Sequence, residues 1–104
     1  MDLTRTFGAL SDPTRRAIVD RLSRGEATIS ELAAPHEMSL PAFTKHIGIL
    51  VDAGVITRRK VGRTVTCALS PLPLDEADAW ITDVRKFWNA SLDRLEDLLT
   101  KEKP

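Results

Sequence analysis

The segment from residue 74 to residue 100 restricts the possible folds more than any other part of the chain. Its apolar residues recur at steps of three and four, and Trp80 and Phe87 add a second stripe beside the first. This spacing predicts an amphipathic helix with a wide apolar face. A chain of 104 residues can form one modest core, and the earlier segments would already make it. We therefore expect the apolar face of this helix to pack against a partner helix.

Residues 28–53 predict a helix-turn-helix. Thr28 and Glu31 match a capping box that opens a short helix. After a tight turn, Ser39 is a fitting N-cap for a second helix over 39–52. Two consecutive helices around a short turn are the layout of a helix-turn-helix.

The helix expected over 39–52 has two different faces. Four apolar residues at helical spacing predict its buried side: Leu40, Phe43, Ile47 and Leu50. Within residues 38–50, the other side carries Thr44, Lys45 and Gly48, with His46 at its edge, and it has no carboxylate. A face that meets phosphates would lack acids because a carboxylate would repel them. For an isolated helix, a solvated polar face would explain the same pattern.

The pattern changes its period after Gly54. Residues 55–69 are rich in Val, Ile and Thr around Gly62-Arg63, which predicts a tight β-hairpin. Residues 39–69 hold five cations and one acid, a net charge of +4, although the whole chain is neutral. This basic middle favours a nucleic-acid-binding surface. The alternative is that Lys and Arg only protect exposed strands of the hairpin.

In their order and spacing, these segments resemble ArsR-type winged helix-turn-helix transcriptional regulators. The resemblance is carried by LSDPTRRAIVDRLSRGEATISELA, MSLPAFTKHIGILVDAGVI, RRKVGRTVTCAL, and by Trp80 followed by Phe87-Trp88 and LDRLEDLL. SLPA together with the late aromatic residues is similar to the metal-free branch of that family. The resemblance implies a mainly α fold with a small β-hairpin, in a single domain over 1–104. The helix-turn-helix would cover 28–53, the wing 55–69 and the C-terminal dimerisation helix 74–100.

Members of that family are bacterial or archaeal homodimers that join through their first and last helices. The resemblance implies a cytoplasmic, sequence-specific repressor that binds an inverted repeat in double-stranded DNA through recognition helix 39–52 and a basic wing. The DNA-binding candidates are Ser39, Leu40, Pro41, Thr44, Lys45, His46, Arg59, Lys60 and Arg63. The dimer-interface candidates are Leu3, Phe7, Trp80, Ile81, Val84, Phe87, Trp88, Leu92 and Leu95.

Several of these residues have alternative roles. Leu40 could be partly exposed and touch a thymine methyl group. His46 either bonds within the helix-turn-helix or reaches a phosphate. The apolar residues of the last helix could also pack within one chain. Arg15 and Arg16 are expected to form ordinary ion pairs on a helix surface.

We expect no cofactor and no metal. The arsenic sensors of the family carry Cys-X-Cys in the third helix, where this chain has Ala33 and Pro35, and residues 71–104 lack the histidine that zinc sensors use. Cys67 is the single cysteine, so no intrachain disulfide can form. It is expected to be a buried thiol, and the alternative is a redox sensor.

Two other classes of function, an enzyme and a module that binds only protein, fit the sequence less well than DNA binding. An enzyme is not expected, because the sequence shows no nucleophile with a base, no paired catalytic carboxylates and no glycine-rich phosphate loop. A winged-helix module that binds only protein would not need the net positive charge of residues 39–69, so this charge argues against that class. No apolar stretch approaches the length of a membrane span. The sequence does not indicate an effector ligand.

Overall fold

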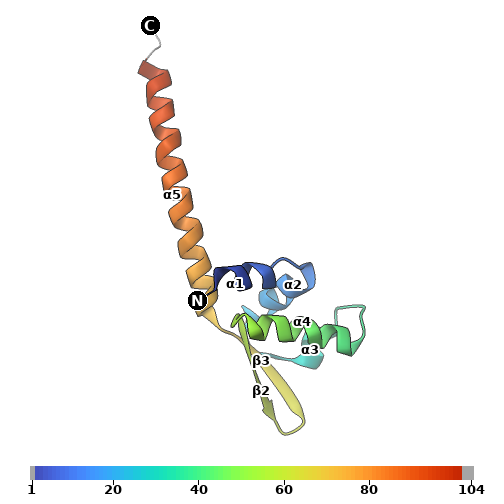
Figure 1. Ribbon diagram of the computed structural model, residues 1–104. Helices are drawn as coiled ribbons and strands as arrows, with labels where there is room; N and C mark the ends of the chain where they lie inside the picture. Colours follow the sequence, from blue (N-terminus) through green and yellow to red (C-terminus); the bar gives the residue numbers. More distant parts are fainter. Residues whose placement is uncertain (1, 102–104) are drawn as a thin grey trace.

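The computed structural model describes residues 2–101, and the ends of the expected 1–104 domain, Met1 and residues 102–104, lie outside them. Figure 1 shows the helices and strands of this part of the chain. In order they are α1 (Leu3–Ala9), α2 (Pro13–Leu22), β1 (Ala27–Thr28), α3 (Ile29–Ala33), α4 (Leu40–Asp52), β2 (Ile56–Val61), β3 (Thr64–Leu69) and α5 (Pro71–Lys101). The predicted mainly α fold with a small β-hairpin is confirmed.

The sheet has one strand more than the sequence predicted. It is antiparallel with the order β1-β3-β2, and Ala27 of β1 pairs with Cys67 of β3. Strand β1 was missed because it has only two residues and ends on Thr28, which is also the N-cap of α3. The turn between β2 and β3 is at Gly62 and Arg63, where Gly62 has a φ of 63° that a side chain would disfavour.

The core lies between the first four helices and the sheet. Phe43, Ile47 and Leu50 point into it from α4 and are fully buried. The expected buried stripe of that helix was wrong at one position, because Leu40 is 60% exposed. Leu40 is the first residue of α4, so its side chain lies beyond the end of the core.

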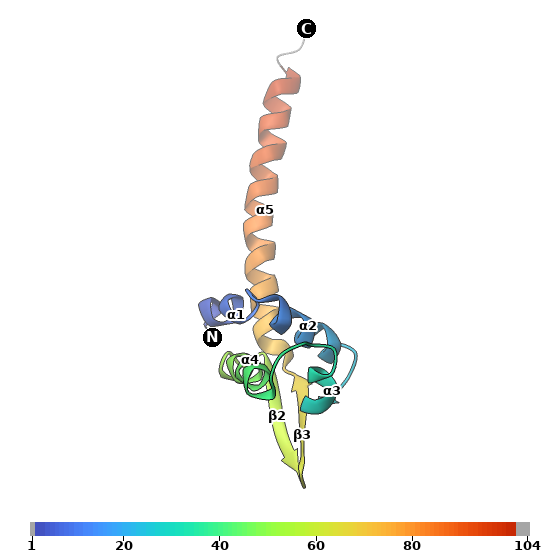
Figure 2. The ribbon, with the colours of Figure 1, turned by 90° about the vertical axis from the view of Figure 1, so that its right-hand side faces the viewer.

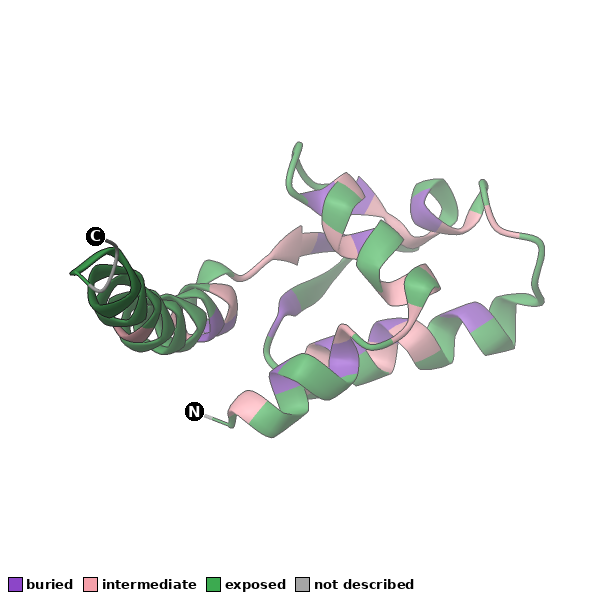
Figure 3. Ribbon diagram, turned by 90° about the horizontal axis from the view of Figure 1, so that it is seen from above, coloured by how far each residue is buried: buried purple, intermediate pink, exposed green. Residues whose placement is uncertain are grey.

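Helix α5 leaves the rest of the molecule and extends away from it, opposite to the β2–β3 hairpin (Figures 1 and 2). The described chain measures 73 × 28 × 22 Å, and its radius of gyration is 19.6 Å. A compact domain of this length would have about 13 Å. Figure 3 shows that α5 is exposed along nearly all of its length; its buried residues are Pro73 and Ala77.

The start of α5 differs from the prediction. The helix was expected over 74–100, but α5 begins three residues earlier, at Pro71, and includes Pro73. The first N–H groups of a helix have no acceptor within it, so prolines in the first turn lose no hydrogen bond.

Helix α1 packs against the base of α5. The rings of Phe7 and Trp80 meet edge to face, with centroids 5.7 Å apart. Leu3 is half-buried, whereas Thr6 and Ala9 are the fully buried residues of α1. Phe7 and Trp80, which were both predicted to bind a second copy of the chain, therefore contact each other within one chain.

Candidate nucleic-acid interface

The N-terminal half of α4 presents its predicted DNA-binding residues to solvent. The side chain of Ser39 caps the helix and accepts a hydrogen bond from the N–H of Ala42 at 3.3 Å. Leu40, Pro41, Thr44 and Lys45 are all exposed, and Thr44 donates its hydroxyl proton to the carbonyl oxygen of Leu40 at 2.8 Å.

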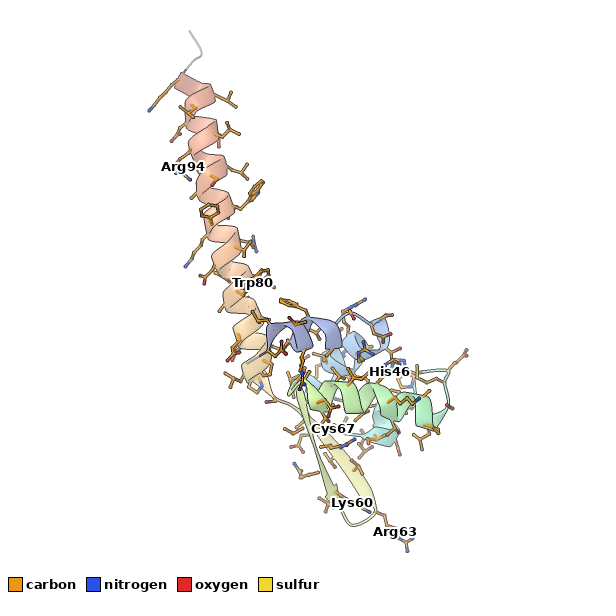
Figure 4. All side chains as sticks on the ribbon, in the orientation of Figure 1. His46, Lys60, Arg63, Cys67, Trp80 and Arg94 are labelled. Atoms are coloured by element: carbon orange, nitrogen blue, oxygen red, sulfur yellow. The ribbon has the colours of Figure 1, made fainter. Side chains whose placement is uncertain are left out.

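The β2–β3 hairpin is the wing, and residues at its tip line one hollow together with residues of α4. Arg63 lies at the tip and Lys60 lies on β2 (Figure 4). A hollow of about 500 Å³ separates the wing from the helix-turn-helix, and its lining residues are Thr28, Ile29, Ser30, Leu40, Thr44, Arg63, Thr64 and Val65. Within residues 2–101, no ion pair involves Lys45, Lys60 or Arg63. These three cations are therefore available to an anionic partner.

Arg59 differs from the other wing cations. Its two terminal nitrogens donate to the two carboxylate oxygens of Glu26 at 3.2 and 3.1 Å. The Arg59 guanidinium lowers the pKa of Glu26, and the carboxylate in turn raises the pKa of Arg59. Because this bidentate pair neutralises Arg59, a phosphate would have to compete with Glu26 for it.

His46 bonds to residues at the start of α2, which lie outside the helix-turn-helix of 28–53 and were not among its expected partners. Its Nδ1 lies 3.0 Å from a terminal nitrogen of Arg15 and 3.7 Å from the carboxylate of Asp12. Asp12 is the N-cap of α2, and the hydrogen bond from the backbone N–H of Arg15 lowers its pKa. His46 thus joins α4 to the start of α2.

Among residues 2–101, Arg15 and Arg16 do not form the surface ion pairs that were expected. Arg15 donates to the carbonyl oxygens of Ala9 and Gly8 at 2.7 and 3.3 Å, and Arg16 donates to that of Leu10 at 2.8 Å. These carbonyls lie at the end of α1, where the last turn of a helix lacks its own donors. Both arginines therefore cap α1 from the first turn of α2.

The apolar face of α5 carries most of the predicted dimer-interface residues. Within one chain they remain open to solvent: Trp80, Ile81, Val84, Phe87, Trp88, Leu92 and Leu95. Phe87 and Trp88 are 73% and 62% exposed. Leu98 and Leu99 are also exposed, and the predicted interface residues did not include them, although their spacing continues the same pattern.

Comparison with known proteins determines the family. A helix-turn-helix domain family matches residues 10–59. The HTH-type transcriptional regulator Rv2034 of Mycobacterium tuberculosis is 36% identical over 98 residues, which cover 94% of this chain and 89% of that protein. A crystal structure of an ArsR family transcriptional regulator is 49% identical, covers 84% of this chain and 90% of its own, and superposes with a TM-score of 0.81. The chain belongs to the ArsR family.

Two further proteins are similar to this chain. The transcriptional repressor SdpR of Bacillus subtilis is 33% identical over 79 residues, which cover 76% of this chain and 88% of that repressor. A homodimeric winged helix-turn-helix domain from Mycobacterium bovis is 20% identical, covers 88% of this chain and 82% of its own, and has a TM-score of 0.61. The winged helix-turn-helix fold is confirmed, and the family consists of DNA-binding regulators of transcription, not enzymes.

The ArsR-family chain has its cysteine in the core. Cys67 is fully buried in β3, and this burial raises the pKa of its thiol. A protonated thiol away from solvent is a poor nucleophile, which fits the predicted packing role. Within residues 2–101 no three His, Cys, Asp or Glu side chains are grouped to hold a metal ion. No helix in the same part of the chain is long and apolar enough to span a membrane.

Replacing Arg15 tests how much the caps on α1 stabilise this ArsR-family fold. Arg15→Ala should lower the free energy of unfolding by about 2 kcal/mol, because it removes bonds to two carbonyls and to His46. Arg16→Ala is the matched control, with one bond lost and an expected cost of about 0.5 kcal/mol. Urea unfolding of both variants at one protein concentration gives the two values. Equal losses would show that the second carbonyl bond of Arg15 and its contact with His46 add nothing.

Proposed function

We propose that this ArsR-family chain acts as a homodimeric transcriptional repressor. It binds an inverted-repeat operator in double-stranded DNA, with α4 in the major groove and the wing on the backbone or in the minor groove. Such a regulator acts on DNA in the cytoplasm.

The observation that carries this proposal is the shared position of α4 and the wing. Leu40 and Thr44 of α4 and Arg63 of the wing line one hollow between the two elements. The exposed residues of α4 carry no acid before Asp52, the last residue of the helix. A duplex placed there would meet cations from two directions, and contacts to phosphate from both elements would fix its register.

Dimerisation is supported by the unpaired face of α5. A soluble chain rarely exposes a continuous apolar surface along a helix unless another chain covers it. The M. bovis neighbour of the same fold is a homodimer. In a two-fold dimer the two α4 helices would read half-sites whose centres lie about one helical turn apart.

Anisotropy of labelled duplex DNA tests the proposal. The full chain is titrated onto DNA from upstream of its own gene and onto a scrambled duplex, at low and near-physiological salt. Tight binding to the upstream DNA that survives added salt, with weak binding to the scrambled duplex that salt removes, is expected. A folded dimer that binds neither duplex would contradict DNA recognition and favour a module that binds protein.

The salt dependence of binding separates the wing cations from one another. Arg63→Ala should reduce the slope of log K against log salt by about 2 per dimer, because each phosphate contact contributes about 0.9. Arg59→Ala should change the slope less, since Glu26 already neutralises that side chain. Equal changes for both variants would mean that Arg59 leaves Glu26 for a phosphate on binding.

A further inference from the structure

The exposed end of α4 is unusually poor in groups that can hydrogen-bond to bases. Met38, Leu40, Pro41 and Ala42 are all exposed there. Residues 38–52 contain no Arg, Asn or Gln, three of the side chains that form paired bonds with base edges. A helix that enters the major groove with this surface must read most of its sequence in another way.

The polar side chains at this end are partly engaged by the helix itself. The Ser39 oxygen accepts from the N–H of Ala42, and the Thr44 hydroxyl donates to the carbonyl oxygen of Leu40. Thr44 therefore keeps its methyl group and an acceptor oxygen for a partner, but its proton is used. Within the described chain, Lys45 takes part in no ion pair, so its ammonium group is free to donate.

Leu40 and Thr44 lie on the same side of α4. They are four residues apart, a spacing that places side chains one above the other on a helix, and both line the hollow that Arg63 borders on the wing side. Leu40 is 60% exposed and belongs to the first turn, the part of a recognition helix that contacts bases. Leu40 and Thr44 thus form an apolar patch that Arg63 borders on the wing side.

We propose that the patch of Leu40 and Thr44 binds the C5 methyl group of a thymine in each half-site, and that Leu40 is the residue that selects it. This inference rests on the proposed operator binding by α4. Thymine is the one base of unmodified DNA that presents an apolar group in the major groove. Phosphates near it would meet Arg63, which lines the same hollow, and Lys45, the residue after Thr44 on α4.

The test uses deoxyuridine, which differs from thymidine only in lacking that methyl group. Duplexes bound by the full chain are first selected from a randomised pool, and each thymine of the enriched repeat is then replaced singly. One thymine per half-site should be sensitive, with an affinity loss of about fourfold for one half-site and about fifteenfold for both. Deoxyuridine at the remaining positions should leave the affinity unchanged.

Two variants assign this sensitivity to Leu40. Leu40→Ala should bind the thymine and deoxyuridine duplexes equally, because the apolar contact is gone. Leu40→Met should keep most of the difference, because it retains a long apolar side chain. Leu40 is exposed, so both variants should melt near the wild-type temperature, and circular dichroism checks this.

The outcomes distinguish this inference from the function on which it rests. A pool that yields no enriched repeat overturns the operator binding, and the thymine contact with it. An enriched repeat without a sensitive thymine overturns the thymine contact alone. A sensitive thymine whose effect persists in Leu40→Ala assigns the methyl group to another residue and also overturns the proposal.

Discussion

Trp88→Asp is expected to separate the dimer into monomers and to abolish operator binding. Trp88 is 62% exposed in one chain and lies in the middle of the apolar face of α5. A charge in a buried apolar interface is left without a partner, and two-fold symmetry introduces it twice. We expect dimer affinity to fall by at least about a hundredfold, as measured by sedimentation velocity over a range of concentrations.

Ala90→Asp is the matched control for this experiment. It introduces the same side chain two positions along α5, about 200° around the helix axis and therefore away from the apolar face. Ala90 is exposed, so this variant should remain dimeric and bind DNA. A Trp88→Asp protein that still sediments as a dimer would show that the interface lies elsewhere.

Lys45→Glu is expected to lower the affinity for the operator by about a hundredfold or more. Each protomer would lose a contact to a guanine or a phosphate and gain a repulsive charge, at about 1–3 kcal/mol per contact. The loss should be greatest at low salt, where the reversed charge is least screened. Anisotropy titrations at two salt concentrations measure both effects.

Lys86→Glu makes the same change in net charge at a distant place. Lys86 lies on α5, which extends away from α4 and the wing (Figure 1). Its effect on affinity should be small at physiological salt because the distance exceeds the screening length. If the two variants weakened binding equally, Lys45 would act only through the overall charge and α4 would not be the reading helix.

The fold was largely predictable because its local signals agree with one another. The capping box at Thr28, the N-cap at Ser39 and the glycine at the hairpin turn each have one structural meaning, and the structure contains all three. The exposed apolar face of α5 was also predictable, because its periodicity continues far beyond what one small core can bury.

What could not be predicted depends on contacts between distant segments. Arg15 caps α1 and reaches His46, which is 31 positions further along the chain, and Glu26 pairs with Arg59 across 33 positions. No spacing rule connects such residues. Leu40 was assigned to the buried stripe by its periodicity, but it lies past the end of the core, and a helical pattern does not show where a core stops.

The two prolines at the base of α5 restrict the direction in which this helix leaves the rest of the chain. A helix of 31 residues is about 46 Å long, so a swing of about 10° at its base would move its far end by roughly 8 Å. Proline fixes its own φ angle, and Pro73 is buried against Gly54, which stiffens the junction. In the proposed dimer, the rigidity of this short junction would determine how closely the separation of the two α4 helices matches the helical repeat of DNA.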